Sequence, residues 1–420
     1  MMLLNAFSGL YAVLPVEQLP STDPRVRAEL LQRLTAQPPD RSSWEVGGGC
    51  NFMLAAARLG LQVASVGHIG TDVYGEFMDG VLLEEGVRPT TRIAEPRPAS
   101  ASAQSPSSPS WPPGSSLPCV LDSTLICFVL VDPEGRHAFC SRYDFGPWPL
   151  LEGIGRLPDR ATRLLRSARA VVTNGFLFDE LPLEVVRGAA LDAIEHGAAI
   201  FFDPGPRCAS MLEGPRRAAL DLLMDLSAVV LMTEEEAHTV TGLSDPEAAA
   251  RAVLSRPGAR ARWVVVKMGA AGALLAERPA GAGRGNGNGN GHGHGQGAGE
   301  AATITRVGAV KVEVADTVGC GDSFAAAIVM GFTRGWSPDV TLALANAVGG
   351  ATATGRGAGR NVARADDVLA LLQRGAEGRG CGEGDGPAQR AAFAAARERL
   401  LEALAARRGG RGAAQLSAAA

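Results

Sequence analysis

VADTVGCGDSFAAAIVMG, residues Val314–Gly331, is the stretch that decides the fold of this 420-residue chain. Valines alternate over residues 310–314 and predict a strand that leads into a Gly-x-Gly turn, with an alanine-rich helix directly after it. Gly319 and Gly321 permit close approach of the backbone, and the N–H groups of the first helical turn can bind an anion. The stretch therefore predicts a strand, a turn and a helix around a charged ligand.

Asp322 stands at the start of this predicted helix and has two interpretations. Its carboxylate can accept a proton from an attacking hydroxyl while the neighbouring amides hold a transferring phosphoryl group. Alternatively, Gly-x-Gly is only a tight turn and Asp322 is an N-terminal helix cap. These residues alone leave both interpretations open.

From about residue 165, short β-branched runs alternate with amphipathic stretches, which is typical of βαβ units around a parallel sheet. The segment 182–196 predicts a helix that ends before Gly197. Because the apolar runs are continuous, we expect strands that are buried on both faces. The predicted strands of this doubly wound α/β core are 170–173, 199–202, 228–232 and 263–267.

The N-terminal third follows a different pattern. Residues 47–60 predict a helical segment that opens on glycines, and residues 125–131 and 137–143 predict a β-hairpin around Asp-Pro-Glu-Gly. The hairpin stands outside the regular alternation of strands and helices. We therefore expect a small β lid over the ends of the core strands.

Glycine and proline are frequent, with 53 and 26 residues, and they are unevenly distributed. Pro and Ser dominate 94–118, and Gly, Asn and His dominate 279–299, so both are interpreted as low-complexity inserts. His292 and His294 in the second insert favour chance contacts over an ordered metal site. The Ala/Arg/Gly-rich tail, residues 376–420, is expected to form a surface helix or a disordered extension.

The charge and cysteine content exclude several classes of function. A net charge of −4 gives no broad basic field, which disfavours nucleic-acid and membrane partners and favours a small molecule. The seven cysteines never form CxxC, so neither a disulfide framework nor a zinc site is expected. No uncharged apolar run is long enough to span a bilayer, and we expect a soluble intracellular protein.

Two further motifs are candidates for ligand contacts. Gly47, Gly48 and Asn51 lie in GGGCN, where glycines let the backbone pack against a polyol and the amide both donates to and accepts from hydroxyls. A bare glycine-rich turn is the alternative. Thr233 and Glu236 have the spacing of a capping box, which would start a helix for structural reasons alone.

The sequence resembles the pfkB family, the ribokinase-like carbohydrate and nucleoside kinases. DTVGCGD matches the family signature Asp-Thr-x-Gly-Ala-Gly-Asp, and GGGCN with Gly60 and Gly70 matches the N-terminal signature. The resemblance implies that Asp322 is the catalytic base and that Gly319, Cys320 and Gly321 supply an anion hole. A nucleophilic Cys320 is the rival interpretation, and it is disfavoured because this position needs only a small side chain.

The resemblance also assigns residues to nucleotide and metal. WVVVKMGAAG, residues 263–272, is similar to the family's ATP-site strand and turn, which implies nucleotide contacts for Lys267, Gly269 and Gly272. A lysine that merely ends a strand is the alternative for Lys267. Thr233 replaces Asn in an Asn-x-x-Glu motif whose Glu, here Glu236, acts on Mg²⁺ through water. Asn346 stands where the family often has an Asn that faces the nucleotide. DPGPR, residues 203–207, resembles Asp-x-Asn-x-Arg, with no role assigned.

The resemblance implies a ribokinase-like domain over residues 44–375, with helices on both faces of a mostly parallel sheet and a β lid. The expected reaction is transfer of the γ-phosphate of ATP, with Mg²⁺, to a hydroxyl of a sugar or nucleoside. A homodimer through the lid is possible. Nicotinamide chemistry is excluded, because GGGCN is not a GxGxxG that follows a first strand.

One part of the family pattern is missing. Members begin with a strand of the type V-x-G-x-x-x-x-D, whose Asp contacts substrate hydroxyls, and residues 3–16 contain no Asp. We therefore expect residues 1–43 to lack the family's first strand. This keeps open a pfkB-like binding or regulatory subunit with weak activity, and GATATGRGAGRNVA, residues 350–363, resembles plastid members, so a chloroplast location stands beside a cytoplasmic one.

Overall fold

The structure is a computed structural model that describes residues 2–5, 8–20, 23–36, 40–93, 124–134, 137–145, 148–151, 153–279, 302–380 and 386–418. Both inserts predicted at 94–118 and 279–299, with His292 and His294, lie almost entirely outside the described residues. None of the described helices combines the length and apolar character that a bilayer crossing requires.

The central sheet has nine strands in the described part of the chain, in the order β13-β12-β11-β10-β9-β8-β1-β4-β5. The strands from β5 to β11 are parallel, and β12 is antiparallel to both of its neighbours. The middle residues of β11 are fully buried, as expected for a strand covered on both faces. The strands are β1 (Met2–Asn5), β4 (Ala64–Gly67), β5 (Arg88–Arg92), β8 (Ala170–Asn174), β9 (Ala199–Asp203), β10 (Val229–Thr233), β11 (Trp263–Lys267), β12 (Ala273–Glu277) and β13 (Thr303–Val307).

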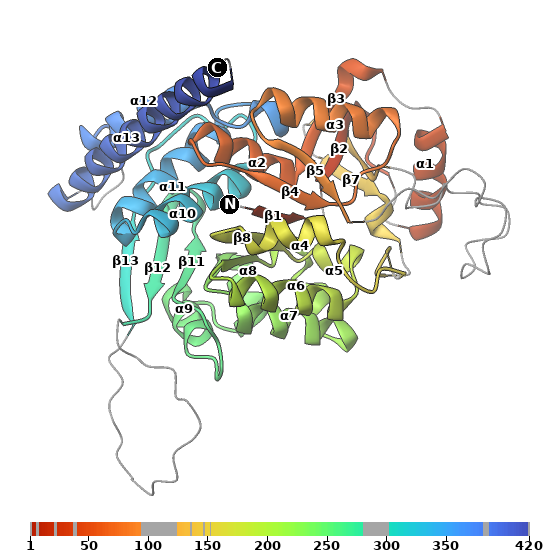
Figure 1. Ribbon diagram of the computed structural model, residues 1–420, viewed down its shortest axis with the longest axis horizontal. Coiled ribbons are helices and arrows are strands. Elements are labelled where there is room, and N and C mark those ends of the chain that lie inside the picture. Colours follow the sequence, from red (N-terminus) through yellow and green to blue (C-terminus); the bar gives the residue numbers. More distant parts are fainter. Residues whose placement is uncertain are drawn as a thin grey trace, which may run out of the picture.

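Helices cover both faces of this sheet, each over its own apolar core (Figure 1). One layer holds α2 (Gly49–Arg58), α3 (Val73–Glu84), α10 (Cys320–Arg334), α11 (Pro338–Ala353), α12 (Ala365–Ala376) and α13 (Pro387–Ala418). The other holds α4 (Asp159–Arg166), α6 (Leu183–Glu195), α7 (Gly214–Leu226), α8 (Glu234–Thr241) and α9 (Pro246–Leu254). The predicted doubly wound α/β fold is confirmed.

A second sheet of four strands, in the order β3-β2-β6-β7, forms the predicted lid. Its strands are β2 (Ser8–Pro15), β3 (Trp44–Gly48), β6 (Ile126–Val131) and β7 (His137–Ser141), and β6 and β7 form the predicted antiparallel hairpin. Phe128 and Leu130 of β6 pack with Leu31 of α1 (Pro24–Ala36), while Cys127 and Val129 belong to the core on the opposite face. Successive side chains of β6 therefore point to opposite faces of the lid and belong to two different apolar clusters.

Two expectations were wrong, and a third is narrowed to one of its alternatives. Strand β1 is an interior strand of the central sheet, where it pairs with β4 and β8, so a core strand does precede residue 44 although the V-x-G-x-x-x-x-D pattern is absent. Residues 308–318 form no strand, because their backbone hydrogen bonds are isolated ones, such as those from Lys311 to Gly380 and from Ala315 to Ala353, rather than a ladder. For the tail, the surface-helix alternative holds over α13, and this helix is packed firmly, because Phe393 and Leu400 are fully buried against α11 and α12.

Gly272 offers a matched test of the turn after β11. It has φ +95° and ψ −130°, and a Cβ there would overlap the backbone of Val307 and Gly308, whereas a Cβ at Gly269 would meet nothing within 4 Å. We expect Gly272→Ala to lower the free energy of unfolding by about 2–4 kcal/mol. Gly269→Ala, with φ +56°, should cost only about 1–2 kcal/mol.

Urea unfolding of the two variants measures this difference. Equal destabilisation by both substitutions would contradict the close backbone approach at Gly272.

Candidate functional site

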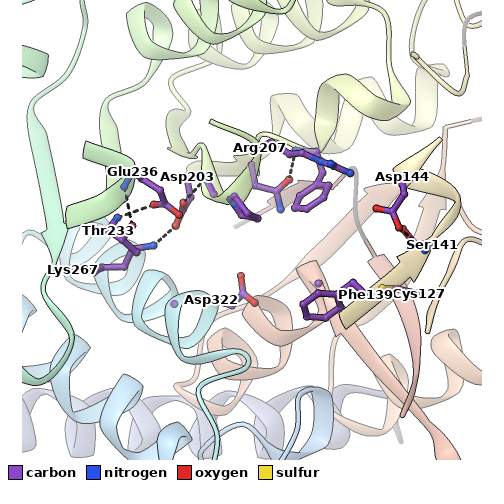
Figure 2. A pocket seen from close by; sticks show the side chains of 16 residues that line it. Cys127, Phe139, Ser141, Asp144, Asp203, Arg207, Thr233, Glu236, Lys267 and Asp322 are labelled. Carbon is purple, nitrogen blue, oxygen red and sulfur yellow. Dashed lines mark hydrogen bonds and ion pairs between the residues drawn. The ribbon is translucent and has the colours of Figure 1, made fainter. Parts of the chain in front are cut away.

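Four neighbouring parallel strands end in polar residues at one edge of the sheet. β8 ends at Asn174, β9 at Asp203, β10 at Thr233 and β11 at Lys267. In open parallel sheets this carboxyl edge is where ligands bind. All four residues line a cavity of about 440 Å³ between the sheet, the start of α10 and the lid (Figure 2). Other lining residues are Gly48, Cys127, Phe139, Ser141, Asp144, Phe176, Gly205, Pro206, Arg207, Glu236, Gly321 and Asp322.

The start of α10 has free backbone amides where the anion site was predicted. Gly319 is the N-cap with φ +81°, a conformation that favours glycine. The Cys320 amide is already used, since it donates to the Thr317 carbonyl at 3.2 Å. The amides of Gly321 and Asp322 form no hydrogen bond with any described residue. The predicted hole is therefore shifted by one residue toward Asp322, and the free amides belong to Gly321 and Asp322.

Asn51 holds the Asp322 carboxylate. Its Nδ2 donates to Asp322 Oδ2 at 2.9 Å, and its Oδ1 accepts from the Gly359 amide at 2.7 Å. The side chain is only 1% exposed, so both ends of the amide face protein atoms. Asn51 was predicted to contact substrate, but in this structure it positions Asp322 relative to the segment that carries Gly359.

The surroundings of Asp322 favour its protonated form. Burial raises the pKa of this carboxyl to about 6, and the Asp203 carboxylate pushes in the same direction. The hydrogen bond from Asn51 and the charge of Lys267 oppose the rise. A carboxyl with such a pKa is close to the range in which a general base works at neutral pH.

Lys267 connects the sheet edge with α10. Its Nζ forms an ion pair with Asp203 Oδ2 at 2.6 Å and lies 3.6 Å from the point that a Cβ at Gly321 would occupy. Burial alone would lower the pKa of Lys267, but the carboxylates of Asp203 and Glu236 outweigh it and the pKa is raised. Its ammonium therefore stays charged beside the free amides, in a place suited to a phosphate group.

Thr233 and Glu236 form the predicted capping box at the start of α8. Thr233 Oγ1 accepts from the Glu236 amide at 3.1 Å, and Glu236 Oε2 accepts from the Thr233 amide at 2.7 Å. Burial raises the pKa of Glu236, and the charge of Asp203 adds to the rise. Figure 2 shows these carboxylates on the same side of the cavity as Lys267.

The donor set suits a hydrated Mg²⁺. In the described part of the chain, no group of three His, Cys, Asp or Glu residues is arranged to hold a metal by itself. Asp203 and Glu236 both line the cavity and repel each other. Mg²⁺ commonly keeps several waters and binds through one or two carboxylates and substrate phosphates, so the two residues fit this ion.

Several residues of the cavity were not predicted to act in it. Asp203 and Arg207 belong to the DPGPR motif, for which no role was predicted, and Asn174 could have been found from its position at a strand end. The lid was predicted, but not which of its residues line the cavity. Arg207 lies 4.6 Å over the Phe176 ring and 2.9 Å from Asp179, and Asp144 is ion-paired with Arg27 at 3.1 Å.

Other predicted site residues lie away from the cavity. Asn346 is buried and donates to the carbonyls of Val307 at 2.8 Å and Gly308 at 3.3 Å. Gly47, Gly269 and Gly272 do not line the cavity, and Gly272 is explained by its contact with Val307. A nucleophilic Cys320 is disfavoured, because burial and the charges of Asp316 and Asp322 raise the pKa of its thiol to about 12.

Comparison with known proteins identifies the class. Residues 156–364 match the pfkB family of carbohydrate kinases. The chain therefore carries a pfkB-family carbohydrate kinase domain, as the sequence motifs predicted. None of the curated proteins gives a significant match.

Solved structures confirm the ribokinase-like fold. A candidate ribokinase II from E. coli in complex with ATP and Mg²⁺ has a TM-score of 0.61 at 20% identity, covering 89% of this chain and 99% of that one. Arabidopsis thaliana ribokinase complexed with ribose and ATP has a TM-score of 0.60 at 17% identity, covering 89% and 98%. Fructokinase with bound ATP from Xylella fastidiosa has a TM-score of 0.59 at 20% identity, covering 89% and 98%. At these identities the likeness establishes the fold.

The hydrogen bond from Asn51 predicts a shift in the titration of Asp322. Asn51→Ala removes a donor that stabilises the carboxylate, so the pKa of Asp322 should rise above about 6. The measurement is an NMR pH titration of the ¹³C-labelled aspartate carboxyls.

Asn346→Ala is the matched control, since it removes another buried asparagine outside the cavity and should leave this titration unchanged. A pKa of Asp322 that stays constant or falls in Asn51→Ala would contradict the positioning role.

Proposed function

We propose that this protein is an ATP-dependent phosphotransferase that moves the γ-phosphate to a hydroxyl of a sugar or sugar-like acceptor, with Asp322 as general base. The observation that carries the proposal is the half-buried Asp322 carboxyl, with a pKa of about 6, beside unpaired amides at the start of α10. In this arrangement a base and an anion site face one cavity. Phosphoryl transfer depends mainly on such positioning and electrostatic stabilisation.

The phosphate end of the proposed site contains Gly321, Asp322 and Lys267. The two amides and the charged ammonium would hold the oxygens of the transferring group, on which negative charge is concentrated. The binding of ATP by solved proteins of the same fold supports this assignment. The charge arrangement in this chain supports it independently, because Lys267 lies against Gly321.

Asp203 and Glu236 are the residues that would hold Mg²⁺, Glu236 through water. When bound, the ion would neutralise phosphate charge and orient the phosphate chain. Burial and the charge of Asp203 raise the pKa of Glu236. A cation bound nearby would act in the opposite direction and favour the ionised carboxylate. A solved structure of this fold contains both ATP and Mg²⁺.

The acceptor end lies under the lid. Phe139 and Phe176 offer apolar surface, and Asn174, Asp144 and Arg207 offer polar groups. A sugar presents both kinds of surface, since its C–H groups can pack against aromatic rings and its hydroxyls form hydrogen bonds. The ribose and fructose kinases among the similar folds support a sugar over a nucleoside.

A catalytically weak binding or regulatory subunit is the second candidate. The hydrogen bonds of Asn51 favour this candidate. Both ends of its amide are bonded within the protein, so neither is left to bind an acceptor hydroxyl. The capping box at Thr233 likewise uses both groups of the Thr-x-x-Glu motif. This candidate predicts nucleotide binding without turnover and a stable protein partner.

Asp322→Asn is the direct test of the base. Asparagine has the shape of aspartate and keeps an oxygen that can accept the hydrogen bond from Asn51, but it cannot take up the proton of the acceptor hydroxyl. The rate of ATP consumption with a sugar should therefore fall about 10²–10⁴-fold. A coupled ADP assay against ribose, fructose, other sugars and nucleosides measures it. Nucleotide binding, followed by calorimetry, should persist.

Full activity in Asp322→Asn would exclude the base assignment. Nucleotide binding by the wild type, with no acceptor in the panel stimulating turnover, would favour the regulatory subunit instead.

The pKa of Asp322 sets the pH dependence of the reaction. The base acts as the carboxylate, so kcat/KM should rise with pH up to about 6 and level off above it. Below pH 6 it should fall about tenfold per pH unit. A pH-rate profile between about pH 4.5 and about pH 8, corrected for loss of folded protein at low pH, measures this. It should fit the titration of a single group. A rate that is flat across that range would contradict the assignment.

A further inference from the structure

A second cavity lies on the outer side of the central sheet, against its edge strand β5. It has a volume of about 340 Å³ and is lined by Ala64, Arg88, Thr91, Arg160, Arg163 and Leu164. Arg88 begins β5, and Arg160 and Arg163 lie three residues apart on α4, so they point from one helix face. Three arginines from two elements therefore meet at one hollow.

These three arginines have no acidic partner. None of their guanidinium groups forms an ion pair or a hydrogen bond with another described residue, and no carboxylate lines the cavity. Two other arginines beside or on the same helix are paired, Arg156 with Asp159 at 3.2 Å and Arg166 with Asp192 at 2.9 Å. The lack of partners is thus specific to the side chains at the cavity.

An anion would relieve the repulsion between these like charges. The three side chains are exposed, so water and salt screen that repulsion, and an anion that bridges them would gain attraction to all three. Guanidinium groups bind phosphate oxygens through paired N–H donors, and Arg is the side chain best shaped for them. The Thr91 residue adds a hydroxyl-bearing neighbour to the lining.

We propose that this cavity binds a phosphate-bearing anion with two or more negative charges, as a phosphate ester or an inorganic polyphosphate. The site is distinct from the kinase cavity, because the two share no lining residue. Ala64 and Arg88 are the first residues of parallel strands, whereas the kinase cavity lies at strand carboxyl ends. The inference is independent of the proposed kinase reaction.

Calorimetric titration of the full chain tests the site with two probes, inorganic pyrophosphate and glucose 6-phosphate, without added metal. The variant Arg160→Gln/Arg163→Gln removes two of the three charges. The control Arg156→Gln/Arg166→Gln removes two paired arginines from the same region and changes the net charge equally. Binding in the kinase cavity is common to both variants, so only their difference reports the second site.

Binding of at least one probe should weaken about tenfold or more in Arg160→Gln/Arg163→Gln and stay within about twofold of wild type in the control. Arg88→Gln, on a different element, should weaken the same probe, and circular dichroism confirms that each variant is folded. The better probe tells whether the ligand is an ester or a polyphosphate. No binding of either probe to wild type, unchanged binding in the site variant, or equal losses in site and control variants would overturn the proposal.

Discussion

The ion pair between the ammonium of Lys267 and the carboxylate of Asp203 is the interaction on which the candidate kinase site depends. The ammonium also feels the charges of Glu236 and Asp322. Without a cation there, three carboxylates would face one cavity and would protonate or separate. Lys267 therefore permits the proposed metal ligands and the proposed base, which are acidic, to stand beside the proposed anion site, which needs positive charge.

The fold meets these demands by where its strands end. β9, β10 and β11 bring Asp203, Thr233 and Lys267 to one edge because they are parallel neighbours. Helix α2 then contributes Asn51, which is hydrogen-bonded to Asp322 and to Gly359, 271 and 308 residues further along the sequence. The positions of the reactive groups are thus set by the sheet and the α2 and α10 packing rather than by a mobile loop.

The core elements were predictable because their signals are local. The apolar run 263–267 gave β11 with its observed bounds, and Thr233 and Glu236 gave the start of α8. Other features depend on tertiary contacts that no local pattern contains. A four-residue strand such as β1 has no periodicity to detect, the valines at 310–314 alternate without a partner strand, and the burial of Phe393 in α13 depends on helices far away in sequence. The pairing of Lys267 with Asp203 and the role of Asn51 are of the same kind.

A crystal structure with a non-hydrolysable ATP analogue, Mg²⁺ and a sugar tests the central claim most directly. The account predicts the γ-phosphate at the amides of Gly321 and Asp322 beside Lys267, and an acceptor hydroxyl within about 3 Å of the Asp322 carboxylate. A triphosphate bound away from Lys267, or an acceptor whose hydroxyls all lie out of hydrogen-bond reach of Asp322, would contradict it.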